Sequence, residues 1–201
     1  MMEGRGAMEG QLERVLAAID AANGKDPGKA RVDGTEVAEA LLYGRRMTAW
    51  LSRRAPEAPD VLAIAARGQH ICRWQIPRSE YPQDRQGYLR WRTTLYRFHA
   101  DQIEPLMRKG GYSEDEISRM RGLVEKKGIK TNPEMQILED VICLVFLEHY
   151  FEDFLKQHPR NKVIDIVRKT WGKMSEDGHQ LALGLTLGDD AMALIGEALS
   201  A

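Results

Sequence analysis

Residues 133–157, PEMQILEDVICLVFLEHYFEDFLKQ, decide the fold, because apolar residues occur almost all the way round a helical projection of this stretch between Ile137 and Leu147. A pattern of this kind predicts a helix that is buried on most of its faces. Such a helix must lie inside a domain, where neighbouring helices cover it. We therefore expect residues 133–157 to form the central helix of the fold.

Two acidic residues, Glu139 and Asp140, interrupt this apolar run. On the helical projection Asp140 falls in line with Ile137 and Leu144, whereas Glu139 falls in line with Met135. At least one carboxylate must therefore point into surroundings that are otherwise apolar. A buried carboxylate without a partner costs on the order of several kcal/mol, so it is normally paired, protonated or bound to a metal. The sequence leaves open both a buried salt bridge to Arg or Lys and a functional site.

The remainder of the chain has helical periodicity and no convincing alternating segment bounded by hairpin turns. A capping box, Ser113 with Glu116, predicts the start of one helix, and Asp60 is a candidate N-cap for another. We expect a single all-α bundle over residues 11–201, preceded by a flexible N-terminus at 1–10. In addition to the central helix, helices are expected at about 12–22, 35–54, 61–70, 88–109, 113–127, 160–174 and 189–200.

The composition is that of a globular protein: of 201 residues, 43% are hydrophobic and 29% are charged, and the net charge of −1 offers no global basic field for nucleic acid. No apolar run approaches the roughly 20 residues of a membrane span, and the first residues, MMEGRGAMEG, lack the apolar region of a secretory signal. Cys72 and Cys143 have no metal-type spacing and are expected to be buried free thiols. We expect a soluble cytoplasmic protein with no membrane partner.

Residues 65–92 combine many arginines with aromatic residues on either side of an irregular stretch that contains two prolines. Guanidinium groups bind phosphate through two parallel hydrogen bonds, and aromatic faces stack on a base or on a guanidinium. The cluster predicts a pocket for a phosphorylated or nucleotide-like ligand, although a solvated loop with surface arginines is the alternative. Its members are Arg67, Arg73, Trp74, Arg78, Tyr81, Arg85, Tyr88, Arg90, Trp91 and Arg92, followed by Tyr96.

Two histidines and an acid follow one another along the chain, in AIAARGQHICRW, FHADQIEPLMRKGGYSEDEI and QILEDVICL. Over residues 39–155 this order resembles the HD superfamily of metal-dependent phosphohydrolases. The resemblance implies an HD-like helical fold and a divalent metal ion held by His70, His99 and Asp140. Two positions depart from the family pattern: Tyr43 stands where the first ligand histidine is expected, and Ile71 replaces the aspartate of the His-Asp pair.

Almost the whole chain also resembles an uncharacterised bacterial family, the domain of unknown function 4202. The stretches that carry this resemblance are IDAAN, LLYGRRMTAWL, QHICRWQIPRSEYP, GYLRWRTTLYRFHA, LEDVICLVFLEHYFEDF and KTWGKMS. The resemblance implies no activity.

The leading hypothesis is a divergent HD-like hydrolase that acts on a phosphate ester or anhydride of a small molecule or nucleotide. A bound metal would activate water, and either Glu139 or Glu104 would be a further ligand or the general base. The expected ligand-binding residues are Arg73, Arg78 and Arg92, which would neutralise phosphate, together with Trp74 and Tyr43.

Two alternatives remain open. A binding module would hold the phosphorylated ligand without turnover and without the metal site, in keeping with the missing ligand residues. A helical interaction protein would instead keep its histidines as satisfied core residues, with His70 and Asp140 far apart.

Overall fold

The computed structural model describes residues 3–128 and 131–200. Its regular elements are, in chain order, α1 (Glu3–Asn23), β1 (Lys29–Val32), β2 (Thr35–Ala38), α2 (Glu39–Arg54), α3 (Asp60–Arg67), η1 (Arg73–Gln75), η2 (Arg78–Glu80), α4 (Arg85–Gly110), α5 (Glu114–Val124), α6 (Pro133–His149), α7 (Phe151–Gln157), α8 (Arg160–Trp171), α9 (Glu176–Leu183) and α10 (Asp189–Leu199). Helix α1 thus begins within the segment 1–10 that we expected to be a flexible end.

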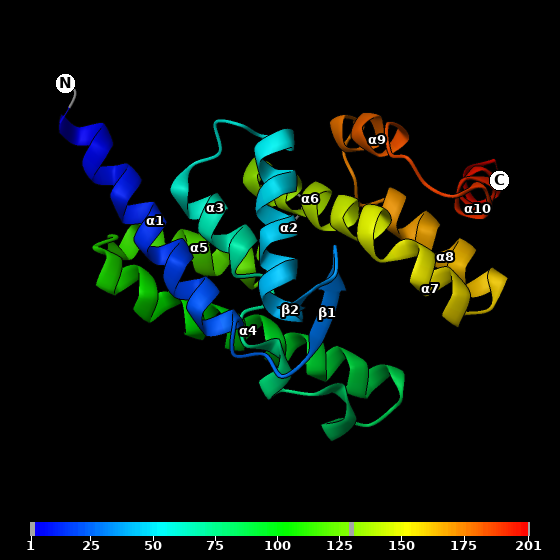
Figure 1. The fold of residues 1–201 in the computed structure, drawn as a ribbon, viewed down its shortest axis with the longest axis horizontal. Helices are drawn as coiled ribbons and strands as arrows, with labels where there is room; N and C mark the ends of the chain where they lie inside the picture. Colours follow the sequence, from blue (N-terminus) through cyan, green and yellow to red (C-terminus); the bar gives the residue numbers. More distant parts are fainter. Residues whose placement is uncertain (1–2, 129–130, 201) are drawn as a thin grey trace.

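Helix α6 lies at the centre of the molecule, where α2 crosses it and where α3, α5 and α9 also contact it (Figure 1). Its apolar side chains are buried on several faces, as Leu138, Val141 and Leu144 are each 0% exposed. Asn132 caps the helix by accepting a hydrogen bond from the backbone N–H of Glu134, and Pro133 occupies the first turn, where a missing N–H costs nothing. The prediction of a buried central helix is confirmed.

The long helix expected over 133–157 is divided in two, so the prediction of one continuous helix is wrong. Tyr150 separates α6 from α7 with φ −129° and ψ −14°, outside helical values. The next residue, Phe151, is 0% exposed and packs edge-on against Phe146, with ring centroids 5.9 Å apart. The break brings Phe151 into the core, which is a tertiary effect that a helical projection does not contain.

Helices α4 and α5 form a packed pair joined by a short turn, and α1 lies against α4 and α3. Gly111 ends α4 with φ +89°, in the left-handed region that favours glycine. The hydroxyl of Ser113 and the carboxylate of Glu116 then exchange hydrogen bonds with each other's backbone N–H groups. The predicted capping box is confirmed. Asp60, in contrast, is the first residue of α3 rather than its N-cap, and its carboxylate accepts a hydrogen bond of 2.7 Å from the Tyr112 hydroxyl.

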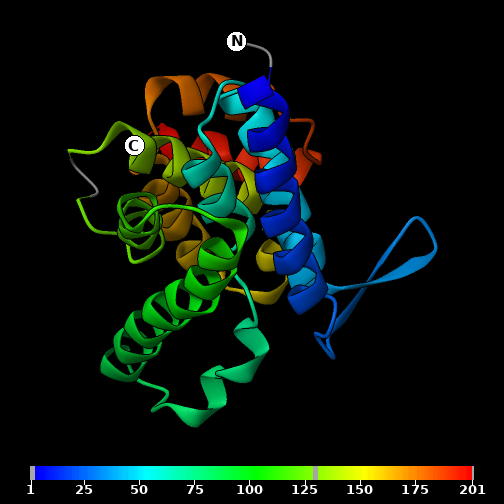
Figure 2. The same ribbon diagram turned by 90° about the vertical axis from the view of Figure 1, so that its left-hand side faces the viewer.

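A β-hairpin is one feature that the sequence patterns do not predict, since they indicate a helix over residues 35–54. Strands β1 and β2 pair antiparallel, and the two-residue turn Asp33-Gly34 has positive φ at both positions, 49° and 79°. Asp-Gly is favoured in such turns because both residues tolerate left-handed backbone. Figure 2 shows the hairpin projecting away from the helices. Few side chains of the hairpin are buried, so its two strands do not alternate clearly between apolar and polar residues in the sequence.

The apolar helix expected at 61–70 ends earlier, so His70 lies in the turn that follows α3. Gly68 closes the helix at a point of close approach to α4, where a Cβ atom would lie 2.4 Å from Cδ1 of Ile103. Cys72, two residues beyond His70, has a positive φ of 53° and turns the chain into the irregular stretch that leads to α4. The tight contact with Ile103 therefore requires a residue without a side chain at position 68, where the helix ends.

In Figure 1 the C-terminal helices α8, α9 and α10 lie on the side of the molecule away from α1. Helix α9 was not predicted. Gly178 lies in its first turn, and a Cβ atom there would come within 2.8 Å of the Asp140 carboxyl group. Glycine thus allows α9 to approach α6, although glycine weakens the sequence signal for a helix.

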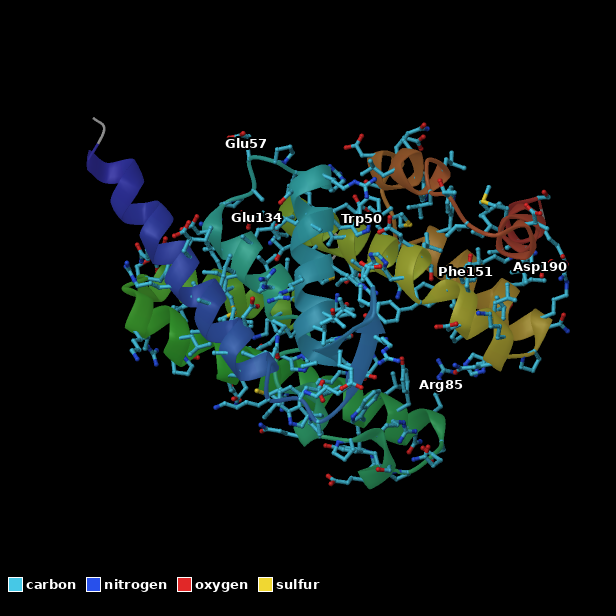
Figure 3. All side chains as sticks on the ribbon, viewed as in Figure 1. Trp50, Glu57, Arg85, Glu134, Phe151 and Asp190 are labelled. Carbon is cyan, nitrogen blue, oxygen red and sulfur yellow. The ribbon has the colours of Figure 1, made fainter. Side chains whose placement is uncertain are left out.

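One hydrophobic core connects these helices into a single all-α domain, as the sequence predicts, and the structure adds a small hairpin to it. In Figure 3 the side chains of Trp50 and Phe151 lie among the helices, whereas Glu57 and Asp190 lie at the periphery. Cys72 and Cys143 are buried free thiols, as expected. Across the described ranges, no helix has both the length and the apolar character that crossing a membrane requires.

Candidate functional site

A cleft of about 1050 Å³ opens between α4, the start of α6 and the connections on either side. Clefts of roughly 300–1,000 Å³ are typical of small-molecule sites. Most of the lining residues are of polar type, and they include three cationic and two acidic side chains: Arg92, Thr93, Tyr96, Glu125, Lys126, Thr131, Asn132, Pro133, Gln136, Glu139, Gly172 and Lys173.

The two acids of the cleft are already paired. Glu139, which is 7% exposed, forms an ion pair with Lys126. Glu125 pairs with Arg121 at 2.8 Å and with Lys127 at 2.5 Å. Of the two interpretations given for the acids of the central helix, Glu139 fits the salt bridge. Its ion pair lies on the wall of a cleft.

Lys126 reaches the cleft from a left-handed backbone position, with φ 59°. It follows Glu125, the C-cap residue of α5, and the backbone N–H of Lys127 donates to the carbonyl of Gly122 at 2.9 Å. This bond closes a Schellman motif, in which glycine usually occupies the position that Lys126 holds. Burial lowers the pKa of Lys126, and the charges of Arg92 and Lys173 act in the same direction, whereas Glu139 opposes them.

The two other cations of the cleft, Arg92 and Lys173, have no acidic partner within residues 3–128 and 131–200. Arg92 donates to the hydroxyl of Tyr96, and its guanidinium lies 5.4 Å from the centroid of that ring. Lys173 lies in the turn between α8 and α9. The cleft therefore carries unneutralised positive charge, which is the electrostatic condition for binding an anion.

Two histidines form a pair of neighbouring imidazoles, His99 buried and His70 partly buried. The rings of His70 and His99 have centroids 6.1 Å apart, and Tyr43 stacks on His70 at 3.7 Å with an interplanar angle of 14°. His99 is 2% exposed, and its Nε2 atom has no hydrogen-bond partner among the described residues. Burial, followed by the charge of Arg73, lowers the pKa of both histidines, that of His99 to about 3. Burial thus favours the neutral form of both imidazoles.

Three of the expected ligand-binding residues, Arg73, Trp74 and Arg78, make contacts within the protein and do not line the cleft. The guanidinium groups of Arg73 and Arg78 lie 4.7 Å and 5.9 Å from the ring centroid of Trp91. Arg78 also donates to the carbonyl of Tyr81 at 3.0 Å. Trp74 packs against the hydrophobic core. Of the predicted arginines, Arg92 is the one that the structure places on the cleft.

Asp140 is 0% exposed, and protein donors occupy both of its carboxylate oxygens. Oδ2 accepts from Nε of Arg54 at 3.0 Å and from the hydroxyl of Ser175 at 2.5 Å. Oδ1 accepts from the backbone N–H of Ser175 at 2.8 Å and from the amide of Gln136 at 3.0 Å. Because Arg54 ends α2 and Ser175 caps α9, Asp140 ties the central helix to both of these neighbours.

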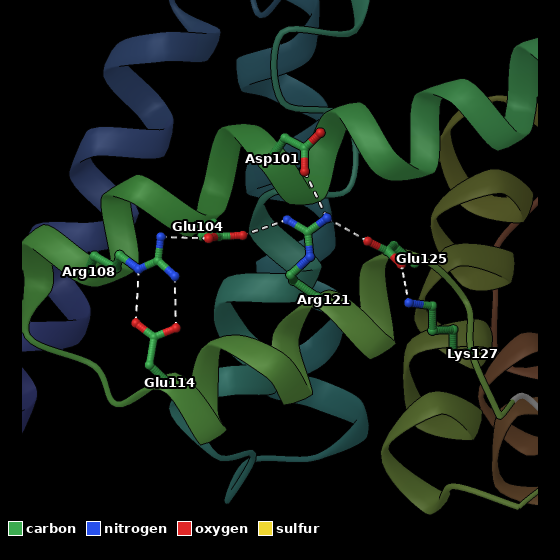
Figure 4. Close-up of polar contacts among 7 residues, drawn as sticks. All are labelled: Asp101, Glu104, Arg108, Glu114, Arg121, Glu125 and Lys127. Atoms are coloured by element: carbon green, nitrogen blue, oxygen red, sulfur yellow. Dashed lines mark hydrogen bonds and ion pairs between the residues drawn. The ribbon is translucent and has the colours of Figure 1, made fainter.

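Glu104 belongs to a network of ion pairs between α4 and α5, shown in Figure 4, and does not line the cleft. Its carboxylate bridges Arg108 and Arg121 at 2.7 Å and 2.6 Å. The network continues to Asp101, Glu114, Glu125 and Lys127. With both oxygens engaged by arginine, Glu104 has a local structural role.

The metal centre implied by the HD resemblance does not fit these residues. His70 and His99 are neighbours, but the carboxylate of Asp140 is fully engaged by Arg54, Ser175 and Gln136. Among residues 3–128 and 131–200, no three His, Cys, Asp or Glu side chains form a group that could hold a metal ion. No contact among the described residues explains why the buried Nε2 atom of His99 lacks a hydrogen-bond partner.

Sequence reasoning missed Lys126 and Lys173, which are the lysines of the cleft. Both lie in connections between helices, where lysines are most often solvated. Lys126-Lys127-Gly128 marks a helix end, but nothing local shows that Lys126 turns inward while Lys127 stays exposed. The ion pair of Lys126 with Glu139 on α6 marks the difference.

A family model described as "Domain of unknown function (DUF4202)" matches residues 13–195, which confirms the resemblance to this family. No curated protein and no solved structure matches the chain. The resemblance to the HD superfamily and the bacterial origin remain predictions.

Proposed function

We propose that this chain, which belongs to the DUF4202 family, binds a phosphorylated small molecule or nucleotide in the cleft between α4 and α6. The observation that carries the proposal is the pair of cations Arg92 and Lys173 on one cleft, without acidic partners among the described residues. A cation about 4 Å from a phosphate oxygen gains on the order of 4 kcal/mol per unit charge at an effective dielectric constant near 20.

The remaining lining supports a compact phosphorylated ligand. Thr131 and Asn132 supply hydroxyl and amide groups, and Tyr96 supplies an aromatic face that already meets the guanidinium of Arg92. These groups can hydrogen-bond phosphate or sugar oxygens, and a ring face can stack on a base. A long nucleic acid needs an extended basic stripe rather than a confined cleft.

A thermal-shift titration tests the proposal, with inorganic phosphate, nucleoside phosphates and sugar phosphates as ligands. A ligand that binds only the native state raises the Tm with concentration. We expect Lys173→Gln to weaken this stabilisation at least tenfold in apparent affinity. Lys169→Gln is the matched control, because Lys169 is exposed on α8 and does not line the cleft. Equal responses of the two variants, or no response of the wild-type protein, would contradict the proposal.

Hydrolysis of the bound ligand is the second candidate, and the position of Glu139 on the cleft wall favours it. A carboxylate beside a bound phosphate ester can position water or accept its proton. The measurement is release of inorganic phosphate from ligands that stabilise the protein, with and without added Mg²⁺, Mn²⁺ or Zn²⁺. Stabilisation with no release under any condition identifies a binding module. Loss of release in Glu139→Gln, with binding retained, identifies the hydrolase.

A cytoplasmic location belongs to the same proposal. Two buried, unpaired thiols at Cys72 and Cys143 are in keeping with a reducing compartment.

A further inference from the structure

We propose that Lys126 is a nucleophile that forms an imine with the carbonyl group of a phosphorylated aldehyde or ketone bound in the cleft. The inference rests on the proposed binding of phosphate by Arg92 and Lys173. It goes beyond that function in two respects: the ligand carries a carbonyl group, and the site forms a covalent bond with it.

The position of Lys126 in the fold is the first argument. It occupies the left-handed residue of a Schellman motif, where the absence of a Cβ atom usually makes glycine the favoured residue. Its side chain is only 11% exposed and lies on the cleft wall, whereas that of the adjacent Lys127 is 71% exposed. A lysine that served only solubility would need neither the strained backbone nor the burial.

The surroundings of the amine are the second argument. A lysine attacks a carbonyl only as the neutral amine, and burial together with neighbouring cations favours that form. Lys126 has both, since Arg92 and Lys173 share its cleft, and the pKa of its ammonium is lowered. The same two cations would hold the phosphate of the ligand, so the reactive carbonyl would be delivered next to the amine.

Glu139 is the third argument, because it forms an ion pair with Lys126 and is itself 7% exposed. It can accept the proton that the ammonium of Lys126 must lose before the amine attacks. It can then return this proton to the oxygen that leaves. Imine formation needs such a group to move protons between the nitrogen and the departing oxygen.

The step balances without an oxidant or a reductant. The nitrogen lone pair of Lys126 forms a bond to the carbonyl carbon, and the electron pair of the C=O π bond moves to oxygen, which takes up a proton. The nitrogen loses a proton and gives a neutral carbinolamine. Protonation of the hydroxyl group and its departure as water leave a protonated C=N bond, and the nitrogen then returns its proton to Glu139 to give the neutral imine. Amine and carbonyl compound become imine and one molecule of water, and hydrolysis reverses the step.

The test uses pyridoxal 5′-phosphate as the probe, with pyridoxal as the control that lacks the phosphate. Brief treatment of the full-length protein is followed by borohydride reduction and peptide mass spectrometry, which reports labelling at each lysine. We expect Lys126 to be labelled at least tenfold faster than Lys127 by the phosphorylated probe. Inorganic phosphate should suppress this preference, and pyridoxal should not show it.

Three variants complete the experiment. Lys126→Arg keeps the charge but lacks the nucleophilic amine, and it should lose the adduct while inorganic phosphate still raises its Tm. Lys126→Gly, which suits the left-handed backbone, is the second variant should the arginine disturb folding, and Lys127→Arg should keep the adduct.

The outcomes separate this inference from the proposed function. Labelling spread evenly over exposed lysines, with phosphate still raising the Tm, overturns the role of Lys126 and leaves phosphate binding intact. Neither selective labelling nor a phosphate-dependent rise in Tm overturns both.

Discussion

Replacing Asp140 by Asn is expected to destabilise the fold strongly, because the carboxylate is 0% exposed and accepts four hydrogen bonds from three residues, Arg54, Ser175 and Gln136. An asparagine has one acceptor oxygen and one donor NH₂ group. Whichever way its amide is turned, the NH₂ group faces either the guanidinium of Arg54 or the donors on the other side. The substitution also removes the negative charge from a buried ion pair.

The magnitude follows from these contacts. Breaking a buried ion pair by removing one charge costs roughly 3–5 kcal/mol. Arg54 is 13% exposed and also pairs with Asp177 at 3.1 Å, so part of its charge stays compensated. We therefore expect a loss of about 3 kcal/mol in the free energy of unfolding, near the lower end of that range. For a chain of this size, this corresponds to a fall in Tm on the order of 10 °C.

The assay is urea unfolding followed by circular dichroism, with Asp165→Asn as the control. Asp165 is an exposed acid on α8, so its replacement should change stability by less than about 0.5 kcal/mol. A chelator should leave the wild-type curve unchanged if the role of Asp140 lies in these protein contacts. The reasoning is refuted if Asp140→Asn unfolds within about 1 kcal/mol of the wild type, since the four donors would then contribute little.

Three further predictions test other parts of the fold. Burial lowers the pKa of His99 from its ordinary 6.5 to about 3. Between these two pH values, the imidazole of His99 binds a proton in the unfolded chain but not in the folded chain. His99 should therefore contribute a fall of about 2 kcal/mol in stability between pH 7 and pH 5, and urea titrations of His99→Phe should lack this contribution. Tyr112→Phe removes the hydrogen bond to Asp60 and should cost about 1 kcal/mol in the same assay; an unchanged midpoint would contradict the contact. Gly34→Ala strains a residue with φ +79°, so amide exchange of residues 29–38 should accelerate while global stability changes little; slower exchange would exclude this turn geometry.

Several features of the fold could be read from local sequence because their causes are local. The capping box of Ser113 and Glu116 needs only residues three apart, and the burial of the central helix follows from apolar residues on most of its faces. The Asp33-Gly34 hairpin is also a local signal, although the few buried side chains of its strands hid it. Such features depend on backbone preferences and side-chain period, which are properties of the sequence.

The candidate site could be predicted only in part. Arg92 was expected to bind phosphate, and it lies on the cleft, but Arg73 and Arg78 stack on Trp91 instead. Arginines that lie close together in sequence have similar local surroundings, so periodicity does not say which of them faces a cavity. Contacts with residues distant in sequence make that choice.

Local sequence patterns are enough to predict a single all-α domain with a buried central helix, and to show that this helix carries two acids in need of partners. The partners of these acids become known from the packing of the helices: Lys126 pairs with Glu139 on a cationic cleft, and Arg54 pairs with Asp140 at the junction of α2, α6 and α9. Neighbours on a helix point in directions about 100° apart, so two consecutive acids can enter quite different surroundings. Their partners come from the ends of other helices, and the packing of those helices sets which charge each carboxylate meets.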